Sequence, residues 1–119
     1  MPTKSTYLTR VPRPPAHLSA AATVIWHRLG RLCVEARTIR QADLPAFEML
    51  VNAVLTEQMA REDIALHGLS TATAAGGRKA NASAATAESA AGRAMVLLEK
   101  FGLVPQRRYD IERLLDGGK

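Results

Sequence analysis

Residues 43–68 read DLPAFEMLVNAVLTEQMAREDIALHG and predict one long helix, around which the rest of the chain is arranged. Asp43 is a favourable N-cap, and a helix that begins there places Pro45 in the first turn, where the missing N–H costs nothing. A start at Arg40 would instead put Pro45 where an N–H should already be bonded. Gly68 then ends the helix. The side that we expect to be buried carries apolar residues at helical spacing, namely Phe47, Leu50, Val51, Val54, Leu55 and Ile64.

A helix over this stretch has roughly 24 residues and is about 36 Å long. A compact chain of this size has a radius of gyration of only about 13.5 Å. One helix therefore spans the whole protomer. Because a single thin domain cannot cover the long sides of such a helix, the sequence predicts an oligomer.

Two further helices are predicted on either side. The first begins at the N-cap Ser19 and runs to about Val34. Its buried stripe consists of Ala22, Ile25, Trp26, Leu29, Leu32 and Cys33. The other begins near Ser83 or Thr86, ends at Gly102 and packs antiparallel on the long helix through small side chains. Its packing face consists of Ala87, Ala90, Ala91, Ala94, Leu97, Leu98 and Phe101.

Residues 69–82 are predicted to form a mobile loop, because Ser, Thr, Ala and Gly dominate them. No stretch of the chain shows a strand pattern. The predicted fold class is therefore all-α: a long antiparallel helical hairpin with shorter flanking helices, about four helices per protomer.

Residues 97–108 read LLEKFGLVPQRR and predict a helix stop followed by a restart. Gly102 suits the left-handed conformation that ends a helix, and Pro105 suits the first turn of a short fourth helix over residues 105–115. Arg107 and Arg108 oppose the dipole of that new helix. A bound phosphate group would explain their position, and two solvated arginines are an equally good explanation.

The chain divides into residues 1–18, 19–115 and 116–119. The first segment holds four of the six prolines and the basic residues Lys4, Arg10 and Arg13, which predicts a flexible arm. A simple leader that covers part of the domain is an equal alternative. Residues 19–115 form the helical domain, and residues 116–119 are expected to be a disordered tail.

Charge is unevenly distributed along the chain. Residues 1–40 carry seven basic side chains against one acidic, residues 41–68 carry one against five, and residues 69–119 carry eight against five. Basic flanks suit a nucleic-acid partner, and an acidic centre suits solvent or a neighbouring subunit. The chain has no apolar run long enough to span a membrane and no apolar secretory segment at residues 1–11, and its single cysteine suits a reducing compartment.

The chain shows no pattern typical of an enzyme or of a cofactor site. His17, His27 and His67 lie in three separate segments without a second ligand at metal-binding spacing. The GGRK at residues 76–79 lacks the spacing of a phosphate-binding loop. We therefore expect no catalysis, no metal and no cofactor.

Three segments together resemble the small terminase subunits of tailed bacteriophages, in the branch found in cohesive-end siphoviruses and related prophages. Residues 12–19 with the Trp-His-Arg-Leu of 26–29 are similar to the family's proline-rich lead-in to a helix that carries a tryptophan. Residues 39–44 resemble the family's Thr-Glu-Ala-Asp-Leu, although Arg40 replaces the usual capping threonine. Residues 97–108 resemble its Phe-Gly-Leu-Thr-Pro-Ser-Ser-Arg.

The resemblance implies a non-catalytic DNA-packaging component in the cytoplasm of the bacterial host. Such proteins assemble into rings, here expected to have about eight to ten subunits, and present double-stranded viral DNA to a large terminase subunit with ATPase and nuclease activities. The residues expected to contact DNA are Lys4, Arg10, Arg13, Arg78, Lys79, Arg107 and Arg108.

Two other classes of protein stay open from the sequence alone. A helix-turn-helix transcription regulator would use the link between the first two helices as its turn, but the second helix is acidic. A structural or adaptor oligomer would not bind nucleic acid at all. The mass in solution and a salt-resolved DNA-binding assay would separate these classes.

Overall fold

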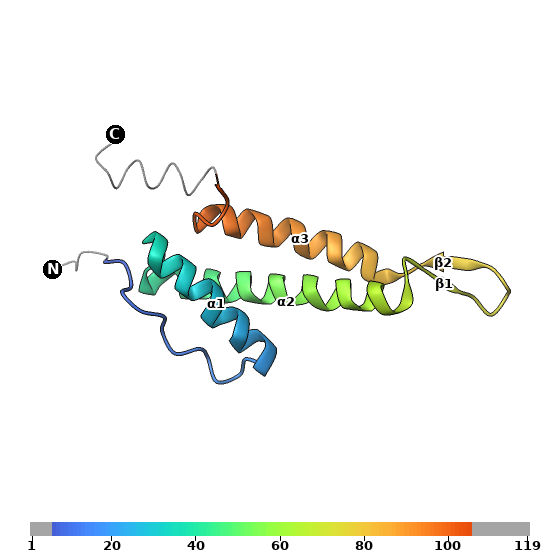
Figure 1. Ribbon diagram of the computed structural model, residues 1–119, viewed down its shortest axis with the longest axis horizontal. Coiled ribbons are helices and arrows are strands. Elements are labelled where there is room, and N and C mark those ends of the chain that lie inside the picture. The colour runs from blue at the N-terminus through green and yellow to red at the C-terminus, as the bar shows by residue number, and fades with distance from the viewer. Residues whose placement is uncertain (1–5, 106–119) are drawn as a thin grey trace.

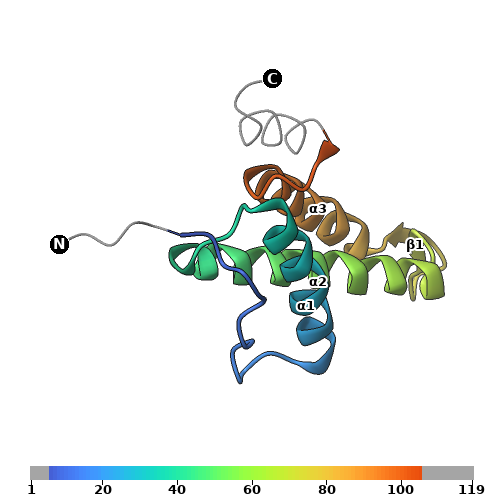
Figure 2. The same ribbon diagram turned by 60° about the vertical axis from the view of Figure 1, so that its left-hand side comes forward.

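The computed structural model describes residues 6–105, and within them the chain is mostly helical, as predicted (Figure 1). Helix α1 (Ala20–Ala36) leads through the 3-10 turn η1 (Gln41–Asp43) into the long helix α2 (Leu44–His67). Strands β1 (Ser70–Ala72) and β2 (Arg78–Ala80) connect α2 to α3 (Ala82–Lys100). Helix α3 runs back along α2, and α1 crosses α2 on another side (Figure 2).

The molecule is elongated. It measures 66 × 36 × 22 Å and has a radius of gyration of 18.2 Å, against about 13 Å for a compact chain of similar length. The pair of α2 and α3 therefore presents long sides that residues 6–105 leave in contact with solvent.

Helix α1 begins and ends with well-formed caps. At its start, Ser19 Oγ accepts a hydrogen bond from the Ala22 N–H at 3.1 Å, as the sequence predicts. At its end, Arg37 adopts the left-handed conformation with φ 57°, so that the N–H of Thr38 reaches the Cys33 carbonyl at 3.0 Å. This is the bonding pattern of a Schellman motif, in which glycine is the preferred residue at the position of Arg37.

Replacing Arg37 with glycine is expected to raise the free energy of unfolding by about 0.5–1 kcal/mol, because the left-handed conformation is costly for a residue with a Cβ. Urea denaturation measures the change. Arg31→Gly is a suitable control, since it places glycine at an exposed position inside α1 and should lower stability by about 1 kcal/mol. A lower stability of the Arg37 variant would contradict the argument.

The long helix begins and ends where the sequence predicts. Asp43 is its N-cap and Pro45 lies in the first turn. The Asp43 carboxylate does not cap α2 itself; instead it accepts a hydrogen bond from the Arg40 N–H at 3.0 Å and closes the turn η1. At the other end, Gly68 has φ 83° and its N–H reaches the Ile64 carbonyl at 2.7 Å.

The prediction that residues 69–82 form a loop without strands is wrong, and their predicted mobility stays a prediction. Strands β1 and β2 pair antiparallel over three residues each, and the hairpin projects beyond the ends of α2 and α3 (Figure 1). Gly76 supplies the positive φ of 88° that the turn needs, and the Thr73 N–H donates to the Gly77 carbonyl at 2.8 Å. Such short, polar strands carry no apolar alternation, so the usual sequence signal for a strand is missing.

Helix α3 begins one residue before the earlier of the two predicted starts. Asn81 is its N-cap, and the Asn81 Oδ1 accepts a hydrogen bond from the Ser83 N–H at 3.0 Å. The predicted stop at Gly102 is confirmed, with φ 70° at Gly102 and a 2.9 Å hydrogen bond from the Leu103 N–H to the Leu98 carbonyl. Pro105 is helical, and the rest of the predicted fourth helix lies outside the described residues.

The core lies where the three helices meet. Phe47 of α2 is fully buried between two other aromatic rings, those of Trp26 at 4.8 Å and Phe101 at 5.8 Å between ring centroids. Burial also raises the pKa of the Cys33 thiol to about 11, which keeps it protonated and unreactive. Leu32, predicted in the buried stripe of α1, is 44% exposed because it lies at the edge of that stripe. Small buried residues bring α2 and α3 close together, namely Ala53, Ala60, Ala90 and Ala94.

Residues 6–18 pack along the helices. The Trp26 indole N–H donates to the Pro12 carbonyl at 2.9 Å. Val11 lies against Gly30, where an added Cβ would come within 2.8 Å of a Val11 methyl carbon. The sequence left open a flexible arm or a leader that covers part of the domain, and residues 6–18 have the contacts of such a leader. The division into residues 1–18, 19–115 and 116–119 stays a prediction.

Candidate nucleic-acid interface

The two basic residues of the leader that the structure describes are both exposed. Arg10 and Arg13 flank Val11 and Pro12, which are held against α1 by the contacts with Gly30 and the Trp26 indole. The backbone that carries these arginines is therefore held in place before any ligand binds. A pre-organised cation loses less conformational entropy on binding phosphate than one on a freely moving strand.

The basic pair of the β-hairpin plays two different roles. Arg78 bonds back to the neighbouring strand, with its Nε 2.8 Å from Ser70 Oγ and a terminal nitrogen 2.9 Å from the Ser70 carbonyl. Arg78 therefore braces the hairpin as well as carrying charge. Lys79 is exposed, and its ammonium group takes part in none of the hydrogen bonds or ion pairs formed among residues 6–105.

The structure does not bring the leader arginines, Arg10 and Arg13, close to the basic pair of the β-hairpin. The hairpin projects from one end of the molecule, whereas the leader packs with α1 beside the other part of α2 (Figures 1 and 2). A ligand that contacts Arg10, Arg13 and Lys79 of one copy must itself be long, as duplex DNA is. Lys4, Arg107 and Arg108, the remaining predicted residues, lie outside the described residues.

Two basic residues of α1 were not among the DNA contacts expected from the sequence. Arg28 and Arg31 are exposed, lie one helical turn apart and point away from the core side of α1. The strong positive charge of residues 1–40, to which both arginines contribute, was the sequence feature that pointed to them. A helix face of arginines is usually only a solvated face, so spacing alone did not single them out. Arg10 and Arg13 of the leader and Arg28 and Arg31 of α1 are all exposed.

Arg40, in contrast, has a structural role. Its guanidinium lies 4.5 Å from the centre of the Tyr7 ring, and one terminal nitrogen donates to the Tyr7 hydroxyl at 2.8 Å. This contact fastens the leader to the turn η1 and explains why arginine is accepted at a position where the resembling family has a capping threonine.

No group of three or more histidine, cysteine, aspartate or glutamate side chains within residues 6–105 is arranged to hold a metal ion. In the same part of the chain, no helix is both long and apolar enough to cross a bilayer.

Comparison with known proteins identifies the family. Residues 22–116, about four fifths of the chain, match the family described as phage terminase, small subunit. The chain belongs to this family. Membership supports a role of this terminase small subunit in packaging phage DNA and confirms the resemblance drawn from the sequence. The match begins at Ala22 of the terminase small subunit and so leaves the leader, with Arg10 and Arg13, outside the shared region. No curated protein and no solved structure matches the chain significantly.

Proposed function

We propose that this terminase small subunit binds double-stranded viral DNA and presents it to a large terminase subunit, which performs ATP hydrolysis and cleavage. The family match is the observation that carries the proposal. In this role the chain is non-catalytic, works in the cytoplasm of the bacterial host and acts as a ring of about eight to ten copies. The elongated protomer, with its long exposed helical sides, supports assembly.

The exposed basic side chains support phosphate contacts as the main source of DNA affinity. Single lysines and arginines bind phosphate weakly, but a ring repeats each of them in every copy, and linked contacts add by avidity. A helix-turn-helix regulator is less well supported, because α2 would be its recognition helix. α2 lies between α1 and α3 and carries four acidic residues against one arginine. Glu62 is exposed, and Glu48, Glu57 and Asp63 are half-buried.

The salt dependence of DNA binding tests the proposal. For the wild-type chain, the logarithm of the binding constant should fall linearly with the logarithm of salt concentration. Lys79→Ala should reduce the slope by about one phosphate contact, and Arg107→Ala with Arg108→Ala by about two. Fluorescence anisotropy with a labelled duplex at several salt concentrations measures both slopes.

Arg61→Ala is a matched control, since Arg61 is an exposed arginine that pairs with Glu57 in the acidic part of α2. Its removal takes away one positive charge and should leave the slope unchanged. An unchanged slope in a test variant removes that residue from the interface. Absence of DNA binding by the wild-type chain at low salt would overturn the proposed function.

A further inference from the structure

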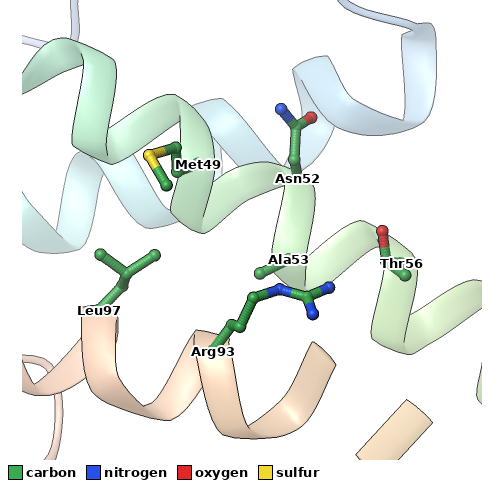
Figure 3. Close-up of a pocket in the computed structure, with 6 residues that line it drawn as sticks. All are labelled: Met49, Asn52, Ala53, Thr56, Arg93 and Leu97. Carbon is green, nitrogen blue, oxygen red and sulfur yellow. The ribbon is translucent and has the colours of Figure 1, made fainter. Parts of the chain in front are cut away.

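A groove runs between the two antiparallel helices α2 and α3, on the face that Figure 3 shows. In this view α1 passes behind α2. The groove has a volume of about 190 Å³. Met49 at one wall is 62% exposed, and Leu97 at the other is half-buried. We call this groove of the α2–α3 helical hairpin the hairpin groove. Its lining residues are Met49, Asn52, Ala53, Thr56, Arg93 and Leu97.

The hairpin groove contains one positive charge. Figure 3 shows the Arg93 side chain extending from α3 across the groove toward α2, between Ala53 and Thr56. Arg93 takes part in none of the ion pairs or side-chain hydrogen bonds formed among residues 6–105. A guanidinium beside apolar walls is well suited to a carboxylate that arrives together with an apolar side chain.

The opposite side of α3 carries an exposed apolar side chain and acidic side chains, which complement the apolar walls and the positive charge of the groove. We call this side of α3 the outer ridge; it consists of Glu88, Gly92, Met95 and Glu99, which recur every three or four residues and are all exposed. Met95 is 57% exposed, and neither glutamate belongs to an ion pair within the described residues. Met95 follows Arg93 by two residues, or about 200° around the helix, so the ridge and the Arg93 side chain face opposite ways.

Because the ridge and the groove lie on different sides of the protomer, one copy cannot use both against a single two-fold partner. Head-to-tail contact is the arrangement that uses both, and repeated head-to-tail contact closes into a ring when the rotation between neighbours returns to the starting copy. We propose that the outer ridge of each copy docks in the hairpin groove of the next, with Met95 beside Met49 and Leu97 and with Glu88 paired to Arg93. This inference rests on the ring assembly proposed above.

The ring geometry selects Glu88 rather than Glu99 as the partner of Arg93. Neighbours in a ring of about eight to ten copies differ by a rotation of about 40°, so their α3 helices run in nearly the same direction. Glu88 precedes Met95 by about 10.5 Å along the axis, and Arg93 precedes Leu97 by about 6 Å. Glu88 of one copy and Arg93 of the next then lie on the same side of the contact between Met95 and Leu97. The long arginine side chain can reach across the remaining distance. Glu99 lies on the other side of that contact.

Charge reversal in the full-length chain tests the pairing. Arg93→Glu and Glu88→Arg should each weaken self-association at least about tenfold, because each sets like charges opposite one another. The double variant should assemble like wild type. An equimolar mixture of the two single variants should also assemble, since the acidic groove of one accepts the basic ridge of the other. Native mass spectrometry and sedimentation velocity measure the masses.

Glu99→Arg is the matched control on the same ridge and should assemble like wild type. Circular dichroism should show unchanged helix content in every variant, since the altered side chains are exposed. If Arg93→Glu assembles like wild type, or if neither the double variant nor the mixture restores assembly, the proposed interface is wrong while the ring and DNA binding stand. A wild-type chain that stays monomeric overturns the interface and the ring together, and the anisotropy assay still decides DNA binding independently.

Discussion

Replacing Phe47 with alanine is expected to lower the free energy of unfolding by about 3–5 kcal/mol. Phe47 is fully buried and makes edge-to-face contacts with both Trp26 and Phe101. These contacts join α1, α2 and the end of α3 through a single ring. Alanine would leave a cavity that all three helices line, and the thin alanine-rich packing between α2 and α3 offers no large side chain to fill it.

Chemical denaturation measures this loss, at two protein concentrations, because self-association adds to the apparent stability. Phe47→Leu keeps most of the volume and should cost clearly less than alanine. Val24→Ala removes apolar atoms from a side chain that is 65% exposed and should change the free energy of unfolding by less than about 0.5 kcal/mol. A loss at Phe47→Ala as small as that of the Val24 control would show that the three rings do not hold the helices together.

Asn81→Ala is expected to cost about 2 kcal/mol, which is large for a polar side chain. The Asn81 side chain caps α3 through the Ser83 N–H, and its Nδ2 donates to the Gly68 carbonyl at 2.9 Å and to Asp63 Oδ2 at 3.0 Å. Asn81 therefore fastens the end of α2, the base of the β-hairpin and the start of α3. Alanine removes the cap and leaves the Gly68 carbonyl without this donor.

The same contact gives the Asn81 variant a distinctive pH dependence. The hydrogen bond from Asn81 is the main reason that the pKa of Asp63 lies below its ordinary value of 3.8. A lowered pKa means that the ionised form stabilises the fold above pH 3.8, and that this contribution is lost as the pH falls through the lower folded-state pKa. The stability difference between wild type and Asn81→Ala should therefore narrow below pH 3.8.

Asn81→Asp separates capping from donation. Aspartate keeps the oxygen that caps α3 but sets a carboxylate opposite Asp63 at neutral pH, so this variant should recover stability as the pH falls. Unfolding curves at several pH values check both variants. A difference between wild type and Asn81→Ala that stays constant down to the lowest pH would remove Asp63 from the explanation.

Local rules predicted most of the helical frame. Ser19, Pro45, Gly68 and Gly102 act within a few residues of themselves, because caps, prolines and left-handed glycines satisfy nearby backbone groups. Phe47 was likewise recognisable as a core residue from its helical spacing. The start of α3 was missed because Asn81 lies inside a stretch of small polar residues, where a favourable capping residue does not stand out.

The candidate site was less predictable than the fold. The sequence singled out basic residues in the leader, in the stretch after the long helix and at the predicted helix restart, yet Arg78 is partly engaged in bracing the β-hairpin. Arg28 and Arg31 could not be ranked above other surface arginines. Which cation meets a phosphate depends on the shape of the whole surface, and side-chain type does not encode that shape.

Helices α1, α2 and α3, their long antiparallel pair and the family could all be predicted from the amino-acid order, because periodicity, caps and motifs are properties of neighbouring residues. Three features became visible only in the folded molecule: residues 6–18 pack against the core, residues 70–80 contain two paired strands, and Arg93 of α3 lines a groove together with Ala53 and Thr56 of α2. Each of these depends on contacts between segments whose free energies arise only after the chain has brought them together.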